Sequence, residues 1–190
     1  PHVDPARHET VTLSTEFGRT GRYHLYRLPD GGERFRSIGS VTVDRPSYLH
    51  SFGLTARYVV LAEFPLRASP FDLLRPGGGA FIERFRWRPD EGTRFLVVDR
   101  DTGEIAADPV GEPFFAFHHV NAFEEDELIV VDVAAFDDPS VIDALYLEGL
   151  ESGFPALDGE LRRYRLSLSG ESVESQTLYG GGVTLPRVSP

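Results

Sequence analysis

The chain has 190 residues and a formal net charge of −11, with 41% hydrophobic and 26% charged residues. This composition is that of a globular domain, and the acidic excess excludes a nucleic-acid partner, because binding a polyanion requires clustered Lys and Arg. The chain contains no cysteine, which rules out disulfides, thiolate zinc sites and cysteine nucleophiles. No apolar run approaches the roughly 20 residues that span a bilayer.

Alternation of apolar and polar residues with a period of two dominates the chain and predicts short β-strands. Turn signals separate the strands at intervals of about ten residues, which favours an antiparallel all-β architecture. The predicted strands are 10–17, 23–28, 37–43, 48–55, 58–64, 84–87, 94–98, 114–122, 128–135, 161–168 and 172–178. Only residues 70–74 and 139–152 have the pattern of a helix.

Two segments, residues 48–64 and 117–133, share one plan. In each, a strand that carries histidine is followed by a turn and by a strand that is apolar on both faces, which predicts burial. The histidines, His50 and His118, lie 68 positions apart, near though above the repeat of roughly 40–50 residues in a propeller blade. Because the innermost strands of a propeller surround its axis, one histidine per blade would build a central metal site.

The adjacent pair His118-His119 has two interpretations. In a regular strand His118 shares a face with Ala116 and Val120, whereas His119 points the opposite way, so only one of the two faces the axis. Most strand histidines only satisfy hydrogen bonds, so an ordinary structural pair stays an alternative to metal binding.

Two stretches resemble the carotenoid cleavage oxygenase family. They are S-Y-L-H-S-F-G-L-T at residues 47–55 and F-H-H-V-N-A at residues 117–122. The opening P-H-V-D-P, R-F-L-V-V-D-R at residues 94–100 and L-P-R-V at residues 185–188 are also similar to family landmarks. The resemblance runs in order over nearly the whole chain.

The resemblance implies a fold and a metal. The fold is a seven-bladed β-propeller, of which residues 1–190 would form an incomplete domain of three to four blades, truncated at both ends. The metal is Fe(2+) on the axis, held by four histidines. By position, His50 and His118 are two of the ligands. The resemblance selects His118 over His119, because the family's F-H-x-x-N pattern places the ligand directly after the phenylalanine. The other two ligands would lie outside this chain.

Further residues acquire roles through the same resemblance. His2 would be a neighbour of the metal and not a ligand. Thr184 stands where many members carry a glutamate that accepts a hydrogen bond from a ligand histidine, and threonine would leave the site more electropositive. Phe52 and Phe117, next to the ligands, are candidates for the lining of a substrate tunnel, with core packing as the alternative.

The implied reaction is cleavage of a conjugated C=C bond of a carotenoid or apocarotenoid with O2, giving aldehyde or ketone products. We expect this fragment alone to be inactive and the protein to be cytoplasmic with peripheral membrane contact. A short apolar patch would make that contact, the alternative being an insertion packed on the propeller. Its residues are Phe71, Leu73, Leu74, Phe81 and Ile82.

Two other functions remain open. One is a non-catalytic propeller that serves as a binding or scaffold module, with its histidines as core residues. The other is an oxygenase of the same family that acts on stilbene-type phenylpropanoids.

Overall fold

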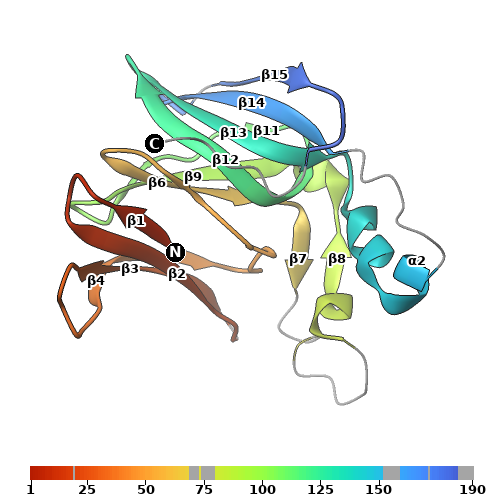
Figure 1. Cartoon of the computed structure of the whole chain (residues 1–190), viewed down its shortest axis with the longest axis horizontal. Coiled ribbons are helices and arrows are strands. Elements are labelled where there is room, and N and C mark those ends of the chain that lie inside the picture. Colours follow the sequence, from red (N-terminus) through yellow and green to blue (C-terminus); the bar gives the residue numbers. More distant parts are fainter. Residues whose placement is uncertain (19, 69–72, 74–79, 152–158, 171, 184–190) are drawn as a thin grey trace.

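Three antiparallel sheets, joined in chain order, make up most of the protein (Figure 1). The computed structural model describes residues 1–190 except 19, 69–72, 74–79, 152–158, 171 and 184–190. In each sheet four strands lie side by side in the order of the sequence, so the first forms one edge and the fourth the other; the second sheet has one further short strand. This four-stranded meander is the unit of a propeller blade, and the all-β prediction is confirmed.

The first blade forms from the alternating segments at the start of the chain. Its strands are β1 (His2–Asp4), β2 (Glu9–Glu16), β3 (Gly21–Pro29) and β4 (Arg36–Val43). The side chains of one face, among them Val11, Leu25 and Val41, are buried. The period-two pattern thus gives one apolar face, as expected for a half-buried strand.

The second blade is interrupted by an excursion. The blade consists of β5 (Gly53–Leu54), β6 (Tyr58–Glu63), β9 (Thr93–Asp99) and β10 (Ile105–Ala107), with β11 (Val110–Gly111) also paired with β9. The excursion contains a two-stranded ribbon, β7 (Leu66–Ala68) with β8 (Phe85–Trp87), and the 3-10 turns η1 (Phe81–Arg84) and η2 (Pro89–Glu91).

The third blade contains the longest strands. They are β12 (Phe115–Glu125), β13 (Leu128–Phe136), β14 (Glu160–Ser167) and β15 (Val173–Tyr179). Between β13 and β14 the chain forms η3 (Pro139–Leu145) and α2 (Leu147–Glu151), which lie beside β8 in Figure 1. The predicted helical region is therefore two short pieces, the first capped by Asp138, whose side chain accepts from the Ser140 N–H.

The second blade lies between the other two, and its central strands contribute to two cores (Figure 1). In β6, Val60 and Ala62 join the core shared with the third blade, whereas Val59 and Leu61 join the core shared with the first. All six residues of β6 are buried. A strand that is apolar on both faces is thus explained by a sheet on each side.

The segment before β5 departs from the prediction of a strand over 48–55. Only Gly53–Leu54 pairs with β6, and the preceding residues are irregular. The Tyr48 N–H donates instead to the Leu66 carbonyl, and Ser47 forms a bridge with Arg67. The chain therefore pairs first with β7 and only then with β6. Of the helix predicted over 70–74, only Leu73 is among the described residues.

Within the described part of the chain, no helix has the length and apolar character needed to cross a membrane.

Candidate functional site

The inner edges of the three blades bring three histidine segments together. His2 lies on β1, His50 lies three residues before β5, and His118 lies on β12, each on or near the first strand of its blade. In a propeller these first strands surround the axis, so the three segments share one central region.

His50 and His118 are in direct ring contact. Their ring centroids are 5.2 Å apart and their planes are nearly perpendicular, at 84°. Tyr48 lies beside His50, with its hydroxyl 3.4 Å from His50 Nδ1. The Phe117 ring packs edge to face with the His50 ring, with 5.6 Å between the two centroids. The predicted convergence of the two histidines is thus present in the structure.

The backbone of β12 is irregular where His118 lies. The pairing with β13 matches Ala116 with Ala135 and His119 with Val133, so the register shifts between them and again before Asn121. Phe117 and His118 both contact the His50 ring, although consecutive residues of a regular strand point to opposite faces. The expected simple alternation along 116–121 is therefore wrong, because a bulge adds a residue and re-aims the side chains.

His119 is held differently from its neighbour. Its backbone N–H donates to Ser51 Oγ over 2.8 Å, and its ring Nδ1 lies 2.8 Å from the same oxygen. Burial of the ring, together with nearby His2 and His118, lowers the pKa of His119 to about 3, so its imidazole is neutral at physiological pH. Its Nε2 is buried and has no hydrogen-bond partner among the described residues.

His2 packs against the start of the second blade. Its ring centroid lies 4.5 Å from that of Phe52, and its ring bonds the Phe52 backbone. Burial lowers the pKa of His2, which favours the neutral ring. His2 also interacts electrostatically with His119, and its role as a neighbour of the metal and not a ligand stays a prediction.

The two facing imidazoles suit a metal ion. Metal–imidazole bonds of about 2.0–2.1 Å place the ring centroids of two adjacent ligands roughly 5 Å apart. The observed separation of 5.2 Å between His50 and His118 fits this spacing. Among the described residues no group of three or more His, Cys, Asp or Glu side chains could hold a metal by itself. Within the described residues the facing pair is therefore not a complete metal site by itself.

Of the three other residues predicted near the metal or the substrate tunnel, the structure describes Phe52 and Phe117 but not Thr184. Phe52 is buried, with 3% of its surface exposed, in the core between the first two blades, which agrees with the core-packing alternative. Phe117 is half-buried and packs on Tyr48 and Phe115 as well as His50. Thr184, which was predicted to lie near the metal, is outside the described residues.

Three of the five residues of the predicted membrane patch can be placed. Leu73 and Ile82 are partly buried against the core, whereas Phe81 is 52% exposed; Phe71 and Leu74 lie outside the described residues.

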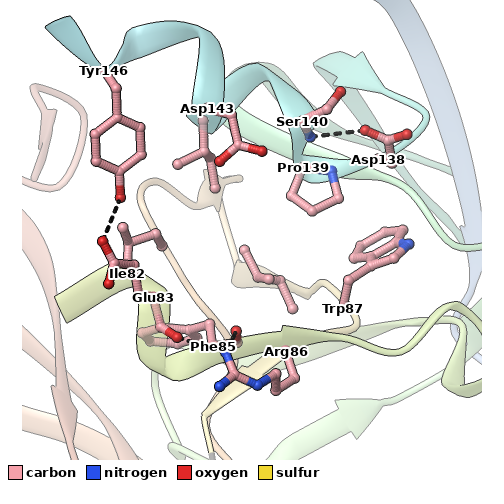
Figure 2. A pocket seen from close by; sticks show the side chains of 12 residues that line it. Ile82, Glu83, Phe85, Arg86, Trp87, Asp138, Pro139, Ser140, Asp143 and Tyr146 are labelled. Carbon is pink, nitrogen blue, oxygen red and sulfur yellow. Dashed lines mark hydrogen bonds between the residues drawn. The ribbon is translucent and has the colours of Figure 1, made fainter. Parts of the chain in front are cut away.

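A cleft opens beside this patch. Figure 2 shows η1 and β8 facing η3 across it, with a hydrogen bond from the Tyr146 hydroxyl to Glu83 Oε1 over 3.5 Å. The cleft has a volume of 510 Å³, and Ile82, Trp87 and Ile142 are among its lining residues. The cleft lies between η1, β8 and η3, and none of the histidines is among its lining residues.

Two contributors to the site are absent from the sequence predictions. Ser51 bonds the β12 backbone, and Tyr48 packs on His50. The only feature of the sequence that pointed to Tyr48 or Ser51 was its position near His50 within residues 47–55. A hydroxyl that follows a histidine is too common a pattern to indicate a role by itself.

Three consecutive antiparallel sheets, each with a histidine on or shortly before its first strand, have the arrangement of blades in a β-propeller. The chain belongs to the RPE65 and carotenoid oxygenase family, because the family model described as "Retinal pigment epithelial membrane protein" matches residues 1–190.

Several characterised proteins are similar to this chain. A mitochondrial carotenoid-cleaving dioxygenase of Mustela putorius furo is 34% identical over 172 residues, which cover 83% of this chain and 32% of the relative. The human beta,beta-carotene 15,15'-dioxygenase is 34% identical over 181 residues, 81% of this chain and 31% of the relative. The chain thus spans about a third of the length of these relatives.

Solved structures agree on the fold. A crystal structure of an ACO/RPE65 chimera superimposes with a TM-score of 0.71 at 25% identity, over 89% of this chain and 35% of the other. A mutant of the Synechocystis apocarotenoid oxygenase gives a TM-score of 0.70 at 25% identity, over 88% and 34%.

Proposed function

We propose that the intact protein is an iron(II)-dependent dioxygenase that cleaves a conjugated C=C bond of a carotenoid or apocarotenoid with O2, giving aldehyde or ketone products. One observation carries the proposal: the imidazoles of His50 and His118, from neighbouring blades, face each other at 5.2 Å. The relatives named as carotenoid-cleaving enzymes support the substrate class.

The chain's own residues would contribute binding and orientation. His50 and His118 would each donate a neutral ring nitrogen to the metal, which as iron(II) would supply the site of O2 activation. Tyr48 and Phe117 flank His50 and restrict its ring, and their aromatic faces offer apolar contact to a polyene. Because imidazole ligands carry no charge, they would leave the metal its full positive charge.

Turnover of the full-length protein tests the proposal. The iron-loaded enzyme is incubated with β-carotene, and separately with an apocarotenal, in detergent micelles under air, and the products are identified by liquid chromatography and mass spectrometry. We expect carbonyl products that are absent without O2 and absent with His50→Ala. An iron-loaded wild type that forms no carbonyl product would favour a non-catalytic propeller or a different substrate class, such as stilbenes. We expect residues 1–190 alone to be inactive, because two of the implied ligands lie outside them.

The proposal includes a cytoplasmic location and peripheral contact with membranes, because carotenoids partition into lipid. Among the described residues Phe81 is the exposed member of the predicted patch, at 52%. Phe81→Ser should reduce sedimentation of the protein with phosphatidylcholine liposomes without changing cleavage of detergent-solubilised substrate. Val110, which is 58% exposed on β11, provides the control Val110→Ser. Equal sedimentation of wild type and both variants would remove Phe81 from the membrane contact.

A further inference from the structure

The bulge in β12 raises the question of what holds His118 toward His50. The register of β12 against β13 shifts between Ala116 and His119, so the backbone that carries the proposed ligand departs from regular strand geometry. A bulge bends its strand and re-aims side chains, so contacts beyond the ladder bear on the direction of the His118 ring.

One side chain supplies such contacts on both sides of His118. Ser51 Oγ donates to the Phe117 carbonyl over 2.8 Å and accepts from the His119 N–H, also over 2.8 Å. These two groups belong to the peptides that precede and follow His118. Ser51 is itself the residue after His50, so one hydroxyl links the backbones of both proposed ligands.

The hydrogen-bonding capacity of this hydroxyl is fully used. A serine hydroxyl has one hydrogen to donate and two lone pairs to accept with. If the hydrogen goes to the Phe117 carbonyl, the lone pairs accept from the His119 N–H and from His119 Nδ1–H, and the ring nitrogen indeed lies 2.8 Å away. Ser51 therefore also holds the His119 ring through its Nδ1.

We propose that Ser51 is a positioning residue of the metal site, whose hydroxyl holds the β12 bulge in the geometry that turns the His118 imidazole toward His50. The inference rests on the proposed function, because it assumes that His50 and His118 bind the metal. Ser51 itself does not touch the metal; it acts through the two peptides that flank His118.

Cobalt(II) binding to the intact, metal-depleted protein tests this role without turnover. The visible ligand-field absorption of Co(II) reports ligand geometry, and competition with a chelator reports affinity. Loss of the hydroxyl in Ser51→Ala should weaken Co(II) binding by about 10–100-fold, as for other groups that orient ligands, and should change the absorption spectrum. Ser51→Thr keeps the hydroxyl and should restore both the affinity for Co(II) and the spectrum. Ser51→Val, whose side chain has the shape of threonine without the hydroxyl, should behave as Ser51→Ala.

Ser47 provides a matched control. It is fully buried in the same segment, and its hydroxyl donates to the Phe64 carbonyl over 2.7 Å, away from β12. Ser47→Ala therefore removes one buried hydrogen bond and lowers the thermal unfolding temperature, while the Co(II) spectrum and affinity should stay those of wild type.

The outcomes separate the two proposals. A wild type that binds neither Co(II) nor Fe(II) would refute the metal site itself. A wild type that binds Co(II), with Ser51→Ala equal to Ser47→Ala in spectrum and affinity, would refute the role of Ser51 alone. If Ser51→Ala does not fold, the Thr and Val variants decide: equal Co(II) spectra and affinities for both would refute the role of the hydroxyl.

Discussion

Two hairpins bring a histidine to the same place through different backbone conformations. The first histidine hairpin is residues 48–63 and the second is residues 115–136. In the first, His50 stands on irregular chain before the two-residue strand β5. In the second, His118 stands within β12, which is 11 residues long and bulged. One hairpin thus shortens its inner strand and the other distorts it, and both end with the imidazole facing its counterpart.

The two hairpins also approach each other closely. A Cβ on Gly53 would lie 3.0 Å from Ala122 Cβ and 3.7 Å from the His119 ring, so the absence of a side chain at this position lets β5 lie against β12. The site therefore depends on the fit between the two hairpins as much as on either alone.

The largest expected effect separates the facing pair from the neighbouring histidine. In the intact protein, His50→Ala and His118→Ala should each abolish iron binding, because each removes a donor of a shared site. His119→Ala should retain most of the iron, because the His119 ring bonds Ser51 and is buried. Iron per chain, measured by atomic emission after gel filtration, checks this. Equal iron loss from His118→Ala and His119→Ala would contradict the assignment of His118.

The second prediction concerns the turn of the first hairpin. Arg100 is fully buried; its guanidinium donates to the Thr55 and Ala56 carbonyls of that turn and to the carboxylates of Asp4 and Glu9 in the first blade. Arg100→Met would leave buried carboxylates without their partner, and removal of one member of a buried ion pair costs about 3–5 kcal/mol.

Unfolding in urea measures that loss. The control is Arg36→Met, at an exposed position of β4, which should change the free energy of unfolding by no more than about 0.5 kcal/mol. If the two variants were equally stable, Arg100 would not hold the first hairpin to the first blade.

Much of this comparison could be predicted from local patterns. The apolar residues on both faces of 58–63 and 129–135 indicate strands between two sheets, and all six residues of β6 are indeed buried. The similar plan of the two hairpins indicates that each brings a histidine to the axis, and the family resemblance selects His118 over His119; the rings of His50 and His118 are in contact. Such features depend on periodicity, which a single sequence displays directly.

The irregular backbone could not be predicted in this way. Tyr48 pairs with Leu66 and not with β6, and the bulge shifts the register of β12 around His118. Both result from long-range packing that overrides the local strand pattern. Arg100 is likewise 96 positions from Asp4, and nothing in either segment specifies the other as its partner.

A smaller effect is expected where the turn of the second hairpin meets that of the first. Glu124 Oε1 accepts from the Thr55 hydroxyl over 2.7 Å and from the Arg57 N–H over 2.9 Å. Glu124→Ala removes the acceptor and should lower the free energy of unfolding by about 1–3 kcal/mol. Glu124 and Glu125 are both exposed, so Glu125→Ala is a matched control; among the described residues Glu125 pairs only with Arg165, at 3.9 Å, and little change is expected. Denaturation midpoints that do not differ between the two variants would show that the turns are independent.

The smallest effect is a pH dependence at the contact between the first hairpin and the first blade. Burial alone would raise the pKa of Asp4, but the hydrogen bond from Arg100 and those from the Arg7 and Ala6 N–H groups outweigh it, so the pKa is lowered. The folded state thus favours the ionised carboxylate. The stabilisation is complete above the unfolded pKa of about 3.9 and is lost as the pH falls through the lower, folded value.

Asp4→Asn exposes this contribution, because asparagine can keep the bonds to the Ala6 and Arg7 N–H groups but not the charge opposite Arg100. The difference in free energy of unfolding between wild type and Asp4→Asn should be constant from pH 7 to about pH 5 and shrink below about pH 4, since protonated aspartate resembles asparagine. The same measurement on the exposed Asp90→Asn provides the control. A difference for Asp4→Asn that does not change down to the pH of acid unfolding would mean that the ion pair with Arg100 does not stabilise the fold. The link from the first blade to the turn after β5 would then depend on the bonds from Arg100 to the Thr55 and Ala56 carbonyls.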